Sequence, residues 1–388
     1  MKKWVTILTA VLLCFTCLQV SALDVRAEDT VTIKVYNWGE YISDGSDDSM
    51  DVIKEFEAQY PGIKVSYTTY ATNEELYAKL RSGSASYDVI VPSDYMISRM
   101  IAEDMLEPLD FSNIPNFADI DDTFKNPQYD PENEYSVPYT WGTVGIIYNT
   151  TMVEGTVDSW EVLWDPQYTG QILMFNNSRD AFGIAEKLLG FSQNTTDVKE
   201  LEQAAEKLKE QKMVLQAYVM DEIFDKMSNG EAALAPYYAG DFFIMQEDNP
   251  DLAFAVPKEG TNLFVDAMVI PKGTEHKKEA ETFINFMLEP DIGLANIEFI
   301  GYSTPLKTVK SMLDEEVLND GISYPSQEIL DKCESFVNLP DELNRYMDEL
   351  WVDIRASGSS SVIELIFLFA VILGLGGALI IYLRRRNR

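Results

Sequence analysis

The 388-residue chain has one histidine and three cysteines, and two of the cysteines fall within its first 20 residues. Cys333 is therefore the single cysteine expected in the mature protein, so no disulfide can form within it. His276 lies among charged residues in PKGTEHKKEA, and we interpret it as a solvated side chain. The sequence also lacks a phosphate-binding glycine loop, a nucleophile elbow and the spacing of a zinc site. We therefore predict a protein that is not an enzyme and that holds neither a metal nor a cofactor.

Positive charge is scarce. Lysine and arginine total 30 against 64 aspartates and glutamates, which gives a net charge of −34. Such a surface disfavours nucleic acid and anionic lipid and attracts cations. Solubility of an extracellular domain explains most of this charge. The same charge would also suit a cationic ligand, and it predicts no nucleic-acid partner.

The N-terminal segment 1–27 has the features of a secretory signal. Lys2 and Lys3 precede an apolar run, and small residues suited to cleavage follow it. Cleavage after Ala22 and cleavage after Ala27 fit equally well. We therefore expect the body of the protein to lie outside the cytoplasm.

The C-terminal segment differs in kind from the rest of the chain. Residues 362–383 are almost wholly apolar, and the arginine-rich residues 384–388 follow at once. About 20 apolar residues span a bilayer, and an arginine cluster marks the cytoplasmic side. The pattern predicts a transmembrane helix with a cytoplasmic basic tail, joined to the body by a Ser/Gly linker at 357–361. The ectodomain would then be anchored to the cell membrane by its C-terminus.

The first half of the body alternates between strand-like and helix-like segments. The strands are predicted at Val31–Tyr36, Ile63–Thr69 and Tyr87–Val91, and the helices at Ser49–Tyr60 and Thr72–Arg81. The second helix opens with the capping box Thr-Asn-Glu-Glu. This rhythm predicts an α/β sheet whose ligands bind at the carboxyl ends of the strands.

The remainder repeats this pattern, and the chain is long enough for two domains. Further buried strands are predicted at residues 138–148, 171–175 and 263–271, with helices at 181–189, 197–211 and 277–288.

Several loops after these strands place aromatic rings beside carboxylates or hydroxyls. Rings offer an apolar body and a negative face, and carboxylates hold ammonium groups. Together they suit a ligand with methylene segments between positive charges. The segments are residues 38–41, 92–95, 176–180, 237–241 and 264–266, with Tyr302 in IGYSTP as a sixth.

Ordinary structural roles could account for several of these side chains. The rings of the first segment could cover a strand end in the core. Ser93 and Asp94 follow a proline and suit the N-cap of a helix, and Asp180 could cap the helix that follows it. Asp266 is harder to account for in this way, because a charge inside a buried strand needs a partner.

Six segments in order along the chain resemble bacterial spermidine/putrescine-binding proteins, the extracytoplasmic receptors of polyamine ABC transporters. They are VYNWGEYI, YDVIVPSDY, YSVPYTWGTVGIIYN, SWEVLWDPQYTGQI, LFVDAMVIPKG and FIGYSTP. The resemblance implies the two-lobed periplasmic-binding-protein fold, type II-like, with a hinge between lobes and a permease as partner. It places the crossings between lobes near residues 141–144 and 262–264. Lobe 1 would comprise 28–142 and 264–310, and lobe 2 would comprise 143–263 and 311–356.

The resemblance and the loop composition together give twelve candidate ligand-binding residues. They are Trp38, Tyr41, Ser93, Asp94, Tyr95, Asn177, Asp180, Tyr238, Asp241, Phe264, Asp266 and Tyr302. Some depart from the family pattern, which tends to have aspartate at Asn177 and tryptophan at Tyr238 and Phe264. Asp241 matches an acid of the putrescine-preferring branch. These departures keep the polyamine class and leave the choice between spermidine and putrescine open.

Three other functions remain open from the residues alone. Receptors of similar architecture coordinate ferric iron with adjacent tyrosines, as in the pair Tyr237 and Tyr238. A glycosidase would also use carboxylates in an aromatic cleft, although no preferred pair stands out. A purely structural surface protein would use the aromatic rings as core.

Overall fold

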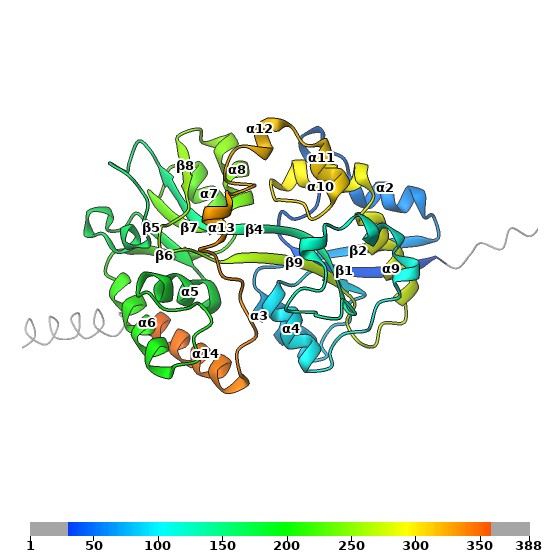
Figure 1. Cartoon of the computed structure of the whole chain (residues 1–388), viewed down its shortest axis with the longest axis horizontal. Coiled ribbons are helices and arrows are strands. Elements are labelled where there is room, and N and C mark those ends of the chain that lie inside the picture. The colour runs from blue at the N-terminus through cyan, green and yellow to red at the C-terminus, as the bar shows by residue number, and fades with distance from the viewer. Residues whose placement is uncertain (1–29, 358–388) are drawn as a thin grey trace, which may run out of the picture.

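The computed structural model describes residues 30–357, which form two lobes side by side (Figure 1). In the first lobe β2 (Ile63–Tyr70), β1 (Val31–Trp38) and β3 (Val89–Ile90) are parallel neighbours, and β9 (Leu263–Val269) and the start of β4 (Ser136–Asn149) extend the sheet in that order. The parallel strands β1 and β3 thus bring their carboxyl ends to the same edge of the sheet. The helices that follow β1, β2 and β3 are α2 (Val52–Gln59), α3 (Asn73–Arg81) and α4 (Asp94–Ala102).

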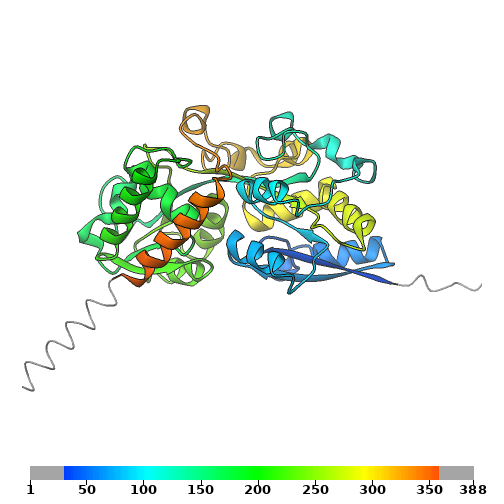
Figure 2. The same ribbon diagram turned by 90° about the horizontal axis from the view of Figure 1, so that it is seen from below.

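The second lobe contains the rest of β4, followed in the sheet by β7 (Leu234–Tyr238), β5 (Ile172–Phe175) and β6 (Leu215–Val219). Strand β8 (Leu252–Ala255) also pairs with β4. Its helices are α5 (Ser178–Leu188), α6 (Val198–Gln211), α7 (Glu222–Ser228), α8 (Ala239–Asp248) and α14 (Asp341–Ala356). Figure 2 shows α14 lying along the helices of this lobe.

Strand β4 belongs to both lobes. It pairs with β9 from Ser136 to Thr143 and with β7 from Val144 to Tyr148, antiparallel in both cases. The change of partner lies in the segment 141–144, where the sequence predicts the first crossing. Every residue of β4 except Tyr148 is buried. The crossing is therefore a continuous, buried strand.

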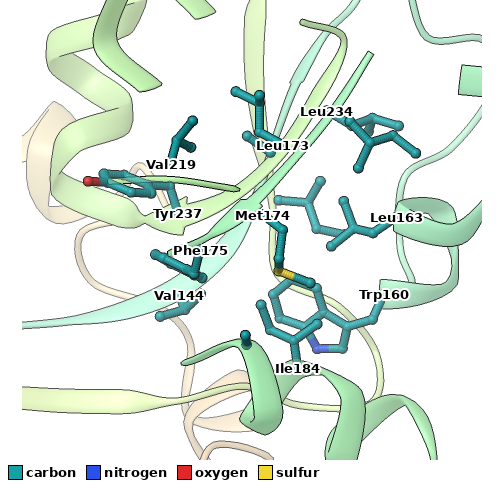
Figure 3. Close-up of a cluster of buried hydrophobic side chains, with 14 of the residues drawn as sticks. Val144, Trp160, Leu163, Leu173, Met174, Phe175, Ile184, Val219, Leu234 and Tyr237 are labelled. Atoms are coloured by element: carbon teal, nitrogen blue, oxygen red, sulfur yellow. The ribbon is translucent and has the colours of Figure 1, made fainter. Parts of the chain in front are cut away.

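Each lobe has its own apolar core. Figure 3 shows part of the core of the second lobe, where Trp160, Leu163 and Phe175 are fully buried. The Trp160 indole N–H donates to the carbonyl oxygen of Gly260 at 3.0 Å, which satisfies its polar atom. In the first lobe Phe56 of α2 packs edge-on against Phe283 of α9 (Lys277–Met287). The residue limits predicted for the two lobes stay a prediction.

The chain returns to the second lobe through a third connection, and the predicted limits of the lobes imply such a return near residue 310. After α9 (Lys277–Met287) and α10 (Pro290–Ile300) it runs along residues 331–340, where the Glu334 N–H donates to the Thr261 carbonyl oxygen at 2.9 Å. The remaining short helices are α11 (Lys307–Met312), α12 (Glu315–Leu318) and α13 (Gln327–Leu330), with 3₁₀ turns at 46–48, 111–113, 115–119, 122–124, 160–164 and 166–168.

The predicted capping box of α3 is confirmed. The Thr72 hydroxyl accepts a hydrogen bond from the Glu75 backbone N–H at 3.1 Å, and the Glu75 carboxylate accepts one from the Ala71 N–H at 3.2 Å. The box therefore reaches one residue further back than the usual pattern.

The predicted signal segment 1–27 and the predicted membrane helix 362–383 with its tail lie outside the described residues. Within residues 30–357, no helix has the length and apolar character needed to cross a bilayer.

Candidate functional site

A cavity lies between the two lobes and encloses about 650 Å³ when its open mouth is included. The ends of β1, β3 and β9 supply one side of it, and the ends of β5 and β7 supply the other. Because strand ends from both lobes meet there, side chains far apart in sequence become neighbours. The structure brings eleven of the twelve predicted residues to its wall: Trp38, Tyr41, Ser93, Asp94, Tyr95, Asp180, Tyr238, Asp241, Phe264, Asp266 and Tyr302.

Asp266 has the buried partner that its place in β9 requires. The Tyr41 hydroxyl donates to Asp266 Oδ2 at 2.6 Å and lies 2.5 Å from Thr140 Oγ1, which donates to it in turn. Asp266 Oδ1 has no partner in the protein. Burial raises the pKa of Asp266 to about 6, although the neighbouring side chains of Ser93 and Tyr41 oppose this rise. One oxygen is thus fixed while the other remains free to take a ligand.

The first aromatic wall is also part of the core. Tyr41 packs edge-on against Tyr302 at a centroid distance of 5.0 Å, and Trp38 lies 4.6 Å from Tyr70. Both Tyr41 and Trp38 also line the cavity. The core and ligand roles that the sequence posed as alternatives are therefore compatible, because each ring packs against another ring and also lines the cavity.

Asn177 is the one predicted site residue that does not line the cavity. It is the N-cap of α5, where its side-chain oxygen accepts from the Asp180 N–H at 2.8 Å and its amide donates to Asp180 Oδ2 at 2.8 Å. The hydrogen bonds of Asn177 go to the helix end and to Asp180, so direct ligand contact by Asn177 stays a prediction without support from the cavity lining. The prediction that Asp180 caps α5 is wrong, because Asn177 occupies the N-cap position. The Asp180 carboxylate instead accepts a hydrogen bond from the Tyr238 hydroxyl at 2.9 Å.

Ser93 occupies the N-cap position of α4 but does not cap it with its side chain. Its hydroxyl accepts from the Asn73 amide at 3.1 Å, and its N–H donates to the Asn73 side-chain oxygen at 3.2 Å. The neighbouring Asp94 is 1% exposed, and its Oδ1 accepts from the Tyr95 N–H at 2.7 Å. Asp94 Oδ2 has no partner, and burial together with the Asp266 charge raises its pKa well above the usual range.

Asp241 and Tyr302 join the two lobes across the cavity. The Tyr302 hydroxyl donates to Asp241 Oδ2 at 2.9 Å. The Tyr302 ring covers Gly240, where a Cβ atom would lie 2.2 Å from the ring, so this contact requires glycine. Burial raises the pKa of Asp241 to about 8, and the charges of Asp221 and Glu40 add to this rise.

Sequence reasoning missed several residues of the cavity wall. Asp221 carries the same signal as the others, an acid just after a strand, but β6 is only partly buried and did not show a strand pattern. A Cβ atom on Gly39 would lie 2.9 Å from Asp221 Oδ2, so the two lobes approach closely there. Phe336 reaches the cavity from the third connection, and no local pattern marks it.

The cavity is strongly acidic. Asp94, Asp180, Asp221, Asp241 and Asp266 line it, and burial raises the pKa of all five. Within the part of the chain that the structure describes, no lysine, arginine or histidine lines this cavity. Buried carboxylates without counter-ions are costly to ionise. A ligand with several positive charges would relieve that cost.

Comparison with known proteins identifies the family. The model of the bacterial extracellular solute-binding proteins matches residues 51–322. The chain belongs to this family. A spermidine/putrescine-binding periplasmic protein of Salmonella typhimurium is 36% identical over 336 residues, which cover 86% of this chain and 93% of that protein.

Solved structures agree with this assignment. A spermidine/putrescine ABC transporter protein from Listeria monocytogenes is 38% identical, with a TM-score of 0.80, and the match covers 84% of this chain and 99% of that one. The substrate-binding protein PotD from Streptococcus pneumoniae is 36% identical, with a TM-score of 0.70 and the same coverage. The predicted resemblance and the α/β periplasmic-binding-protein fold are confirmed. As an extracytoplasmic solute-binding protein the chain is not an enzyme, which removes the glycosidase alternative.

Proposed function

We propose that this solute-binding protein is a receptor for spermidine and putrescine that delivers its ligand to the permease of an ABC transporter. The observation that carries this proposal is the cavity between the lobes, where five carboxylates and several aromatic rings form the wall and no basic side chain of the described residues lines it. Its relatives of 36% identity or more are spermidine/putrescine-binding proteins by name. A polyamine supplies the positive charges and the methylene segments that such a wall accommodates.

Three carboxylates are placed to hold ammonium groups. Asp180, Asp241 and Asp266 each accept one hydrogen bond from a tyrosine, which fixes their orientation and leaves lone pairs for a ligand. A hydrogen bond between a charged pair stabilises by about 1.5–3 kcal/mol. Two of these carboxylates suffice for putrescine, and all three would serve spermidine.

Aromatic rings would contact the methylene segments and the cation faces. Trp38, Tyr238 and Phe264 line the cavity from both lobes. A cation over a ring face contributes about 0.5–2 kcal/mol. Ser93 and Tyr95 would complete the wall of the first lobe, and Tyr95 is oriented by its hydrogen bond to Glu74 at 2.8 Å.

Closure of the lobes would couple binding to transport. The proposed lobes are 28–142 with 264–310 and 143–263 with 311–356, so β4 and β9 form the hinge. The Tyr302–Asp241 hydrogen bond and the close approach of Gly39 to Asp221 both support a cavity that closes by contact between lobes. A permease would recognise the closed form.

We further propose that residues 362–383 anchor the receptor to the cell membrane, with 384–388 in the cytoplasm. The apolar run and its arginine cluster support this anchor. A tether of this kind holds the receptor near its permease at high effective concentration.

The ferric-iron alternative has weaker support. Tyr237 and Tyr238 both line the cavity, but burial and nearby carboxylates raise the pKa of both phenols well above the usual value. Phenolate ligation would need the metal ion itself to offset this shift. Within residues 30–357 no group of three histidine, cysteine or acidic side chains is placed to hold a metal ion.

Calorimetric titration tests the proposal directly. The full-length protein in non-ionic detergent is unfolded, washed free of carried-over ligand, refolded and titrated with putrescine and spermidine. We expect saturable one-to-one binding of at least one of them. Folded protein that binds neither would refute the polyamine function, and a visible absorption band on adding ferric iron would then favour the iron receptor.

A further inference from the structure

Asp94 lies between two hollows of the structure. It lines the cavity between the lobes, and it also lines a second hollow on the other side of the third connection. Among the described residues, Asp94 and Phe336 are the two that line both hollows. Ser98 of α4, Gln128, Tyr129 and Asn338 belong to the second hollow alone. The two spaces are therefore separated by one carboxylate and one aromatic ring.

The Asp94 carboxylate lacks the side-chain donor that orients each of the three proposed ammonium ligands. Its Oδ1 is held by the Tyr95 backbone N–H, while Oδ2 is buried without a partner. The Tyr129 hydroxyl in the second hollow is also buried without a partner. Burial and the nearby Asp94 carboxylate raise the pKa of Tyr129 well above the usual value. Two unpaired polar groups thus remain close together beyond the main cavity.

The partition beside Asp94 is apolar and consists of a single ring. Phe336 is 4% exposed and packs edge-on against Tyr95 at a centroid distance of 5.8 Å. The Arg179 guanidinium covers it at 4.3 Å. A methylene segment lying along this ring would keep an apolar contact between the two hollows.

We propose that Asp94 and Tyr129 form a fourth ammonium subsite, which extends the ligand range of this receptor to tetraamines such as spermine. This inference rests on the proposed polyamine function. Three ammonium groups would occupy the main cavity, and the terminal aminopropyl arm would pass Phe336. Its ammonium would donate to Asp94 Oδ2 and to the phenol oxygen of Tyr129, which satisfies both unpaired groups.

The subsite has two measurable consequences. Spermine should bind at least tenfold more tightly than spermidine, because it gains one charge-assisted hydrogen bond. Spermine should also release more protons on binding than spermidine does, because the buried Asp94 carboxyl ionises when the ammonium arrives. Titration in two buffers of different ionisation enthalpy measures this difference.

Two variants of the full-length protein separate the subsite from the main cavity. Asp94→Asn should lower the ratio of spermine to spermidine affinity at least tenfold and abolish the extra proton release. Ser98→Phe fills the second hollow without lining the main cavity, so it should lower the same ratio while spermidine affinity is kept. Ser98→Ala is the matched control and should leave the ratio unchanged. Thermal melts verify that each variant is folded.

The possible results are distinct. If spermine binds no more tightly than spermidine, or if neither Asp94→Asn nor Ser98→Phe lowers the ratio, the subsite does not exist and Asp94 is solvated by water. If putrescine, spermidine and spermine all fail to bind the folded protein, the polyamine function itself is wrong, and this inference is refuted with it.

Discussion

Replacement of Asp266 by asparagine should weaken ligand binding and stabilise the ligand-free protein at the same time. Asparagine keeps the shape of the side chain and can still accept the hydrogen bond from Tyr41, which is 2.6 Å long in the native protein. The substitution removes the charge and replaces one carboxylate oxygen with an amide NH2 donor. Replacing a residue that has a structural role would destabilise the protein. Replacing a residue that binds a cation should stabilise the protein when that cation is absent.

The size of the stabilisation follows from the pKa. The pKa of Asp266 rises from its usual 3.8 to about 6 in the folded protein, which corresponds to about 3 kcal/mol. Because the pKa of Asp266 is higher in the folded protein than in the unfolded one, the native protein pays no penalty for Asp266 below pH 3.8. It loses about 3 kcal/mol of stability as the pH rises through 6. At pH 7.5 Asp266→Asn should therefore unfold with a free energy about 3 kcal/mol higher than the native protein, and the gain should vanish near pH 4.

Binding should change in the opposite direction. Loss of one charge-assisted hydrogen bond costs about 1.5–3 kcal/mol, so the Kd for spermidine should rise about 10- to 150-fold at pH 7.5. Denaturant unfolding at pH 4 and 7.5 and calorimetric titration measure the two effects. Glu247→Gln, which removes an exposed carboxylate from α8, is the control and should change neither. A destabilised Asp266→Asn protein with native affinity would refute the assignment of Asp266 as an ammonium ligand.

Three further predictions concern the same cavity. Trp38→Ala should weaken spermidine and putrescine alike, by about 2- to 30-fold, because a ring face binds methylenes and cations without counting charges; a loss confined to one ligand in calorimetry would contradict this. Raising sodium chloride from 50 to 500 mM should weaken spermidine more than putrescine, since screening acts on each charge, and equal salt slopes would argue against three ammonium contacts. Affinity should rise from pH 6 to pH 8 with release of protons, because the pKa of Asp241 is about 8 in the free protein and an ammonium lowers it. Binding heats independent of the buffer would contradict that linkage.

Local sequence could predict most of the cavity wall because its residues follow directly on strand ends. Trp38 and Tyr41 lie at or just after the end of β1, Asp94 comes after β3, and Asp180 after β5. The topology of an α/β sheet brings such positions together whatever the details of the loops. Asp266 stood out as a candidate site residue because a carboxylate inside a buried strand is costly unless a cation or a hydrogen-bond donor compensates it.

Other parts of the site depend on information that no local pattern contains. Asn177 and Asp180 are three residues apart, and sequence alone does not tell which of them bonds to the helix end and which lines the cavity. Phe336 reaches the cavity only because the third connection pairs with Thr261 and Leu263, more than 70 residues earlier in the chain. Asp221 was missed because the partly buried strand before it lacks clear alternation.

The shared strand β4 restricts how the length of this chain can change in evolution. Side chains alternate between faces along a strand, so an inserted or deleted residue between Thr143 and Val144 would turn every following side chain of β4 to the opposite face. Ile146, which belongs to the core of the second lobe, would then exchange places with its neighbours. Single substitutions along β4 leave its register unchanged. The insertion or deletion of one residue would shift the register of β4 in one of the two lobes and disrupt that lobe. We therefore expect changes in length to be tolerated in surface loops and not within β4.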